Sequence, residues 1–235
     1  MRVVDDASDL RHMRVSYGPD GSVMAGSLAE ADLAPTPLAQ FRRWLAEAVA
    51  AELPEPNAMV LGTVSPEGVP SARTVLLKDI DARGLAFYTN LESTKGQDLA
   101  ATGRASCVFP WFAMHRQVVV TGRAIRVPRE EAADYFASRP IGSRWGAWAS
   151  RQSEVLDGRE PLDARYAEIA ERYPDEVPLP DFWGGWMVVP DTMEFWQGRD
   201  SRLHDRLRFR RAVDDDHADA ALDDAGAWVV ERLSP

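Results

Sequence analysis

The chain has 235 residues, of which 45% are hydrophobic and 27% are charged, as in a folded protein with a sizeable core. Its formal net charge of −10 argues against nucleic acid or an anionic membrane as a general partner, so an anionic small ligand would need a local basic pocket. No apolar run is long enough to span a membrane, and no signal-peptide core is present. The single cysteine, Cys107, is interpreted as a small core residue, and a cytoplasmic location is expected.

Lysine is rare in this chain. Of the 27 basic residues 25 are arginine, and Lys78 and Lys95 are the only lysines. A compact ammonium differs in shape from the planar arginine fork, so a chain rich in arginine is expected to keep lysine where that shape is needed. Because there are only two lysines, the alternative is that their positions are a coincidence. The two lysines are therefore the first candidate site residues.

Residues 1–35 show weak periodicity and several glycine, aspartate and alanine residues, which predicts an arm that is partly mobile. Residues 36–235 are expected to form a single domain. Thr36-Pro37 is a typical helix start, an N-cap followed by a first-turn proline. Apolar residues from Leu38 to Ala48 recur at helical spacing, so this helix should pack an apolar stripe against the body.

Consecutive β-strands are expected from residue 58 onward. Several strands with only short helices between them favour an antiparallel barrel with peripheral helices over a parallel nucleotide-binding sheet. No Gly-x-Gly-x-x-Gly follows any strand, which argues against a dinucleotide site. The acidic stretch 212–227 is interpreted as a solvated insertion. The predicted strands are 58–64, 70–78, 85–89, 105–111, 117–127 and 228–233, and the predicted helices include 129–139 and 160–173.

The second predicted strand and the helix after the third carry basic residues. Arg73 and Lys78 are five apart and would fall on opposite faces of a regular strand, so they would serve different ligands or different ends of one. Ser93 is a plausible N-cap for a short helix that Lys95 joins in its first turn. A helix start with an added ammonium suits a phosphate, although a capped surface helix would look the same.

A second group of residues that could bind an anion follows. Tyr135 and Arg139 are four apart, hence on one helical face. Ser143 lies just past the break made by Pro140 and Gly142, where its hydroxyl is available. An arginine, a tyrosine hydroxyl and a serine make a second anion site, and the alternative is a Tyr-Arg pair that only packs at a helix end.

Residues 193–206 read Met-Glu-Phe-Trp-Gln-Gly-Arg-Asp-Ser-Arg-Leu-His-Asp-Arg. Arg202, His204 and Arg206 are spaced two apart, so on an extended backbone all three project from one face, close to Trp196. Two guanidiniums and an imidazole beside an indole suit a flat, anionic ligand. The alternative is a solvated basic edge strand.

The pattern Glu-aromatic-Trp-Gln, then four residues, then Arg-Leu-His-Asp-Arg resembles the C-terminal signature of the pyridoxamine 5′-phosphate oxidases, flavoenzymes of vitamin B6 metabolism. Further motifs of that family occur in family order across residues 36–235. The resemblance implies an FMN-binding split β-barrel and a homodimer with shared active sites. It also implies oxidation of pyridoxamine or pyridoxine 5′-phosphate to pyridoxal 5′-phosphate by oxygen, with release of hydrogen peroxide and without a metal.

The resemblance also implies roles for individual residues. Lys78, Arg202 and His204 would be catalytic, with Arg202 and His204 at the pyridine ring and Lys78 near the reacting end. The expected FMN-binding residues are Arg73, Thr74, Val75, Leu76, Leu77, Lys78, Tyr88, Thr89, Lys95, Gln117, Gln152, Ser153, Trp196 and Arg206. The expected substrate-binding residues are Arg14, Tyr17, Lys78, Tyr135, Arg139, Ser143, Arg202 and His204.

Two residues depart from the family pattern. Thr94 stands where relatives often have arginine beside the phosphate lysine, and Ile141 replaces a common arginine.

Two other functions stay open. A related oxidase of phenazine-type biosynthesis would share the C-terminal motif but tends to lose a residue such as Lys78 and the Tyr-Arg-Ser trio, and a non-catalytic carrier of flavin or pyridoxal phosphate would keep the fold.

Overall fold

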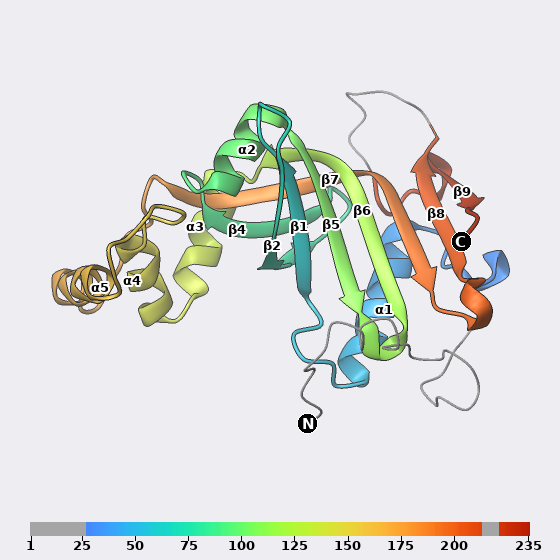
Figure 1. Ribbon diagram of the computed structural model, residues 1–235, viewed down its shortest axis with the longest axis horizontal. Coiled ribbons are helices and arrows are strands. Elements are labelled where there is room, and N and C mark those ends of the chain that lie inside the picture. The colour runs from blue at the N-terminus through green and yellow to red at the C-terminus, as the bar shows by residue number, and fades with distance from the viewer. Residues whose placement is uncertain (1–26, 213–220) are drawn as a thin grey trace, which may run out of the picture.

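The computed structural model describes residues 27–212 and 221–235. Across these residues nine strands form one curled antiparallel sheet with helices around it (Figure 1), which confirms the predicted split β-barrel with peripheral helices. The sheet order is β2-β1-β5-β6-β7-β4-β3, and β8 joins β7 and β9. The strands are β1 Ala58–Val64, β2 Pro70–Leu76, β3 Asp79–Ile80, β4 Leu85–Asn90, β5 Arg104–Trp111, β6 Arg116–Arg126, β7 Trp183–Gln197, β8 Asp205–Arg211 and β9 Trp228–Arg232.

Strand β7 is where the barrel splits. Residues 183–188 of β7 pair with β4, and residues 192–197 pair with β8. One edge of β7 therefore has two separate neighbouring strands. On its other side it follows β6 along its length, with an irregularity at Thr121/Gly122. A Cβ at Gly122 would lie 2.1 Å from the Val189 carbonyl oxygen, so only glycine allows this close approach.

The helices and short 3-10 turns lie around the sheet. The predicted helices at residues 129–139 and 160–173 are present as α3 and α5, each one residue shorter. The α-helices are α1 Pro37–Ala50, α2 Thr94–Thr102, α3 Arg129–Ser138, α4 Ile141–Ala149 and α5 Glu160–Arg172. The 3-10 turns are η3 Glu30–Asp32, η4 Phe112–Met114, η5 Asp200–Arg202 and η6 Ala225–Ala227.

Helix α4 was not predicted from the sequence. Its two glycines lower its intrinsic helix propensity, so the helix depends on contacts with neighbouring segments for its stability. The indole of Trp145 donates a hydrogen bond to the Tyr173 carbonyl oxygen at 2.9 Å, and the indole of Trp148 donates one to the Pro178 carbonyl oxygen at 2.7 Å. Helices α4 and α5 lie together at one end of the molecule (Figure 1).

Helix α1 begins as predicted and covers the core. The Thr36 hydroxyl accepts a hydrogen bond from the Ala39 backbone N–H at 3.2 Å, and proline occupies the first turn. Trp44 is 2% exposed and meets the Phe195 ring edge-on at a centroid distance of 5.3 Å. Burial of each such large apolar side chain contributes about 1.5–3 kcal/mol to folding. The predicted apolar stripe is therefore confirmed.

Cys107 lies in the core, as predicted, and burial raises the pKa of its thiol to about 12. No described helix is long and apolar enough to cross a membrane. Of the predicted arm, residues 1–26 lie outside the described residues, and so do Arg14 and Tyr17. The interpretation of 212–227 as a solvated insertion is wrong at Leu222, whose side chain is fully buried and whose carbonyl oxygen accepts from the Leu38 N–H at 3.1 Å.

Candidate active site

A cavity of about 750 Å³ opens between β2, β4, the start of α2 and the segment that joins α3 to α4. It brings together most of the predicted cofactor-binding and substrate-binding residues, although they come from distant parts of the chain. The predicted residues that line it are Arg73, Thr74, Val75, Leu76, Lys78, Tyr88, Thr89, Lys95, Tyr135, Arg139, Ser143 and Gln152.

Arg73 and Lys78 line the same cavity, so the expectation that they project from opposite faces of one strand is wrong. The reason is that β2 ends at Leu76. The next two backbone N–H groups change partners, because Leu77 donates to Asn57 and Lys78 donates to Ala86. This bend turns Lys78 back into the cavity and buries the Leu77 side chain in the core, outside the cavity lining.

The guanidinium of Arg73 is held in place by neighbouring strands. Its Nη1 donates to the Thr63 hydroxyl at 2.7 Å and to the Leu61 carbonyl oxygen at 3.3 Å, and its Nη2 donates to the Ser71 hydroxyl at 2.5 Å. Burial lowers the pKa of Arg73, and the negative charge of Asp98 opposes this shift. The guanidinium is therefore a fixed positive charge at this end of the cavity.

Lys95 is only 8% exposed and has no carboxylate partner within the described part of the chain. Its ammonium donates to the hydroxyls of Thr89 and Ser93, both at 3.2 Å, and to Oε1 of Gln152 at 2.5 Å. Burial lowers the pKa of Lys95 to about 8, and the charge of Arg73 adds to this effect. A buried ammonium beside a fixed guanidinium, with neutral oxygens only, fits a phosphate group as the missing anion.

Ser93 caps α2 as predicted, since its hydroxyl accepts from the Gly96 N–H at 3.4 Å. Thr94 is exposed, and its N–H donates to the Ser153 hydroxyl at 3.3 Å. Thr94 and Ser153 line an adjoining hollow of about 420 Å³, which also contains Arg151. The predicted FMN contact Ser153 therefore lies outside the main cavity.

The middle of the cavity has an aromatic wall. Tyr88 stacks on Tyr135 with ring centroids 4.2 Å apart, and on Trp183 with centroids 5.6 Å apart. The ammonium of Lys78 lies 5.9 Å from the centroid of the Tyr135 ring. Trp183 was not predicted as a site residue, and neither was Asn90, which also lines the cavity. Both lie at the paired ends of β4 and β7, and this pairing was not predicted from the sequence.

At its other end the cavity contains Arg139. Its backbone is extended because it precedes Pro140, so α3 ends at Ser138 and the expected helical face does not include Arg139. The guanidinium packs over the Trp183 ring at 5.0 Å, and its Nη1 is buried without a hydrogen-bond partner among the described residues. Burial lowers the pKa of Arg139. Ser143 lies past the break at Pro140, as predicted, in the first turn of α4, whereas Gly142 belongs to that helix and not to the break.

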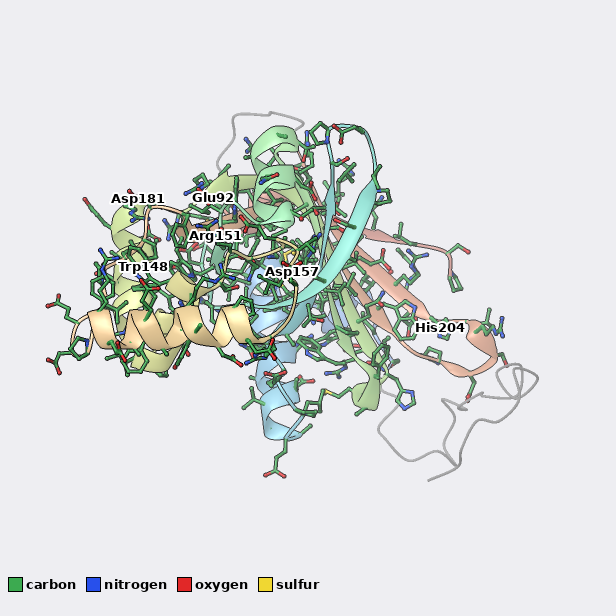
Figure 2. All side chains as sticks on the ribbon, turned by 60° about the vertical axis from the view of Figure 1, so that its left-hand side comes forward. Glu92, Trp148, Arg151, Asp157, Asp181 and His204 are labelled. Atoms are coloured by element: carbon green, nitrogen blue, oxygen red, sulfur yellow. The ribbon has the colours of Figure 1, made fainter. Side chains whose placement is uncertain are left out.

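The C-terminal motif lies elsewhere. Gln117, Trp196, Arg202, His204 and Arg206 do not line the cavity, and Figure 2 shows His204 on the opposite side of the molecule from Arg151. These residues surround the far ends of β6 and β7, where Gln117 and Trp196 pair in register.

The motif is not one extended face. Arg202 belongs to η5 and has a positive φ of 62°, and β8 begins only at Asp205, so the expected common projection of Arg202, His204 and Arg206 is wrong. The His204 ring lies 4.6 Å from the Trp196 ring, and burial and then the charge of Arg202 lower the pKa of His204. Arg206 forms a two-pronged ion pair with Glu194, with a shortest distance of 2.7 Å.

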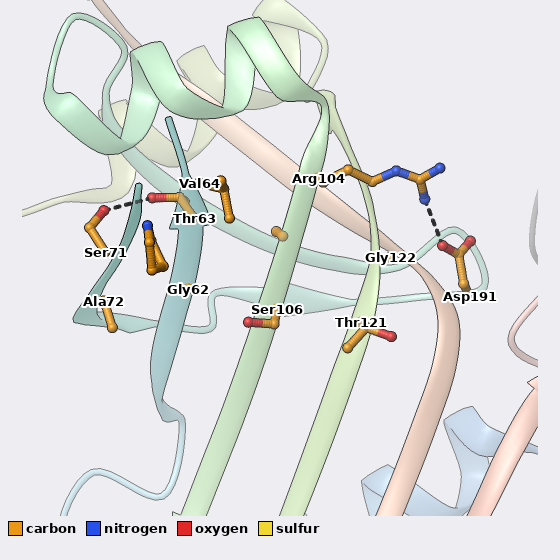
Figure 3. Close-up of a pocket in the computed structure, with 12 residues that line it drawn as sticks. Gly62, Thr63, Val64, Ser71, Ala72, Arg104, Ser106, Thr121, Gly122 and Asp191 are labelled. Carbon is orange, nitrogen blue, oxygen red and sulfur yellow. Dashed lines mark hydrogen bonds and ion pairs between the residues drawn. The ribbon is translucent and has the colours of Figure 1, made fainter. Parts of the chain in front are cut away.

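A third hollow, of about 590 Å³, lies on the outer face of β1, β2, β5 and β6 (Figure 3). Its floor consists of small residues such as Gly62, Ala72 and Ser106. The arginine at its rim, Arg104, is already paired with Asp191 at 2.8 Å. This hollow therefore lacks the unpaired cations of the main cavity.

Comparison with known proteins agrees with this geometry. The family model described as pyridoxamine 5′-phosphate oxidase matches residues 45–173, and the model described as the pyridoxine 5′-phosphate oxidase C-terminal dimerisation region matches residues 183–235. The chain belongs to the pyridoxamine 5′-phosphate oxidase family. The relatives in this family are named as oxidases, so the chain is assigned as an oxidoreductase. The match also confirms the resemblance seen in the C-terminal motif.

Individual members of the family are similar over nearly the whole chain. A pyridoxine/pyridoxamine 5′-phosphate oxidase of Burkholderia multivorans is 52% identical over 226 residues, which cover 96% of this chain and 99% of the relative. One of Acidothermus cellulolyticus is 52% identical over 216 residues, covering 91% and 92%. The match thus extends from the barrel into the dimerisation region.

Two solved structures are similar to this chain. PhzG from Burkholderia lata, in complex with tetrahydrophenazine-1-carboxylic acid, has a TM-score of 0.79 and 32% identity, covering 88% of this chain and 98% of that one. A pyridoxamine 5′-phosphate oxidase-related, FMN binding protein of Nostoc punctiforme shares the fold, with a TM-score of 0.64 and 16% identity over 89% of this chain and 100% of that one.

Proposed function

We propose that this protein is an FMN-dependent oxidase that converts pyridoxamine 5′-phosphate and pyridoxine 5′-phosphate to pyridoxal 5′-phosphate, with oxygen reduced to hydrogen peroxide. One observation carries the proposal. Among the four basic side chains of a single cavity, Lys95 and Arg139 come from distant parts of the chain, each is half-buried or buried, and neither is paired with a carboxylate in the described part of the chain. Two monophosphates, one of a cofactor and one of a substrate, match this arrangement.

The residues present fit FMN. Lys95 and Arg73 would hold its phosphate together with the hydroxyl-rich start of α2, since the buried ammonium lacks an anion. The backbone of residues 74–76 and the aromatic wall of Tyr88 and Trp183 would flank its ring system. The bound flavin would supply the two-electron redox chemistry, and the protein binds, orients and excludes water.

The substrate would lie against the same wall. Arg139 and Ser143 would bind its phosphate, and Tyr135 would place a hydroxyl beside them. The charge on Lys78 is exposed within the cavity, near the Tyr135 ring, where it can hydrogen-bond the polar groups of a pyridine. A substrate anchored by its phosphate would keep one orientation over the cofactor, which is how binding energy lowers the barrier.

We further propose a homodimer in which the partner subunit completes each site. Within one chain, Arg202 and His204 lie away from the cavity. Both belong to residues 183–235, the stretch that matches the dimerisation region of the family. In a two-fold dimer the motif of one subunit would reach the cavity of the other, so Gln117, Trp196 and Arg206 would meet the FMN of the partner.

The second candidate is a phenazine-type oxidase, which the similarity to PhzG favours. Oxygen uptake by the FMN-loaded protein, with pyridoxamine and pyridoxine phosphates and with their dephosphorylated forms, separates the two. We expect efficient turnover of the phosphorylated pair and only poor turnover of the dephosphorylated forms. Turnover of a reduced phenazine carboxylate without turnover of either vitamer would favour the second candidate, and binding without any turnover would leave a carrier.

The protein is expected to bind FMN in preference to FAD. The positive charges of Lys95 and Arg73 are placed for a terminal phosphate, and an esterified diphosphate would lose part of that contact. Flavin fluorescence quenching during titration with each flavin measures this preference. A protein that quenches neither flavin would rule out the flavoenzyme proposal.

FMN binding is expected to weaken as the pH rises from 7 to 9. The pKa of Lys95 without a bound anion is about 8, so the ammonium is charged below pH 7 and largely neutral above pH 9. The dissociation constant should rise by up to about tenfold per pH unit above the pKa. Lys95→Arg is the matched control, because its guanidinium stays charged and should leave the constant nearly flat across this range. A wild-type constant that is also flat would contradict the role of Lys95.

A further inference from the structure

Two arginines lie close to the turn between α3 and α4, and neither forms an ion pair with an acidic residue in the part of the chain that the structure describes. Arg139 is the C-cap residue of α3 and Arg144 is the fourth residue of α4. The Nη1 of Arg139 and the Nε of Arg144 are both buried without a hydrogen bond, and neither residue forms an ion pair with a described residue. Buried N–H groups on charged side chains are costly to leave unmatched, so these two arginines are suited to an anionic ligand.

The charges of the two arginines act on each other. Arg144 disfavours the charged form of Arg139, in addition to the larger effect of burial, and only Tyr135 opposes these effects. No carboxylate acts on Arg139 in this balance. Two neighbouring guanidiniums without an anion repel each other, whereas a doubly charged anion would neutralise both.

The fold adds further positive potential at the same place. Helix α4 begins at Ile141, two residues after Arg139, and its N-cap residue, Pro140, offers no side-chain acceptor to the first turn. The positive end of this nine-residue helix therefore lies at the turn next to Arg139, and Arg144 is the fourth residue of the same helix. Ser143, which lines the cavity, belongs to this first turn.

We propose that Arg144 supplies the second positive charge of the substrate-phosphate site and acts with Arg139 on the same dianion. This inference rests on the function proposed above. Arg144 does not itself line the cavity, so it acts as a positioning residue, through its charge. A purely structural arginine would show an ion pair or a hydrogen bond to the fold, and the described residues give Arg144 neither.

The test uses the full-length, FMN-loaded protein with Arg144→Gln, Arg144→Lys and, as a matched control, Arg172→Gln. Arg172 is exposed on the neighbouring helix α5, so its replacement changes the net charge equally. For Arg144→Gln we expect the KM for pyridoxamine 5′-phosphate to rise about 5- to 30-fold at low salt with kcat unchanged. Arg144→Lys should restore most of this loss, and Arg172→Gln should behave as wild type.

Binding without turnover gives an independent measurement. Calorimetric titration with pyridoxal 5′-phosphate and with inorganic phosphate should show the same loss of affinity in Arg144→Gln. Because the effect is one of charge, the difference from wild type should shrink as salt is raised to about 0.5 M. The dissociation constant for FMN should stay unchanged.

Two results would overturn the inference. One is equal affinity of wild type and Arg144→Gln for phosphate and pyridoxal 5′-phosphate at low salt. The other is a lowered melting temperature with weakened FMN binding that Arg144→Lys does not restore, which would give Arg144 a structural role. If wild type oxidises neither vitamer, the proposed function fails, while the two titrations still decide the role of Arg144.

Discussion

A mixed dimer of two inactive variants is expected to regain about half of the wild-type activity, because a two-fold dimer with shared sites would contain one intact site. The cavity variant carries Lys78→Ala and Arg139→Ala, and the motif variant carries Arg202→Ala and His204→Ala. The physical basis is that the first pair lines the cavity and the second pair lies away from it in the same chain. In the mixed dimer the intact cavity of one chain would meet the intact motif of the other.

The two variants are co-expressed with different affinity tags, and the mixed dimer is isolated by both tags and assayed by oxygen uptake. The matched control combines wild type with a chain that carries all four substitutions. Shared sites would leave this control inactive, because each site then has one damaged component. Sites within single chains would reverse both outcomes, giving an inactive mixed dimer and a half-active control.

Arg139→Ala is expected to raise the KM for the phosphorylated substrate by roughly 10- to 150-fold, since a charge-assisted hydrogen bond is worth about 1.5–3 kcal/mol. FMN should stay bound, because Arg139 takes no part in the hydrogen bonds that hold Arg73 and Lys95, the two cations assigned to the FMN phosphate. Steady-state kinetics and flavin titration of the same preparation measure both quantities.

The dephosphorylated substrate is the control for Arg139→Ala. Its poor turnover should change little, since it has no phosphate to lose. If instead the variant loses FMN while the KM for the substrate is unchanged, the FMN phosphate lies at Arg139 and the substrate phosphate lies at Lys95.

The sequence predicts those elements that are bounded by local signals. The predicted bounds of β1 are the observed ones, because a Ser-Pro-Glu-Gly turn follows Val64 directly. Helix α1 begins at its Thr36 cap for the same reason. In contrast, the end of β2 at Leu76 depends on Asn57 and Ala86, which take the next backbone hydrogen bonds from distant parts of the chain. Local patterns contain no information on such partners.

The residues of the candidate site also divide into those that local motifs predict and those whose role depends on distant parts of the chain. Lys95, with its Ser93 cap, and the trio of Tyr135, Arg139 and Ser143 were predicted from short motifs, and the structure places them around one cavity. Trp183 was missed as a wall residue because its role depends on stacking with Tyr88 across paired strands. The distance of the C-terminal motif from the cavity follows from the length of β7, a property of the whole sheet.

The scarcity of lysine makes the cavity accessible to selective chemistry. Lys78 and Lys95 are the only side-chain amines in the chain, and both line the same cavity. Because the pKa of Lys95 is about 8, a large part of this amine is unprotonated in mildly alkaline buffer, the form that acylating reagents attack. Apart from the chain's α-amino group, such reagents can label only this site, so the extent of labelling at each lysine, read by mass spectrometry, reports directly how far ligands shield the two amines.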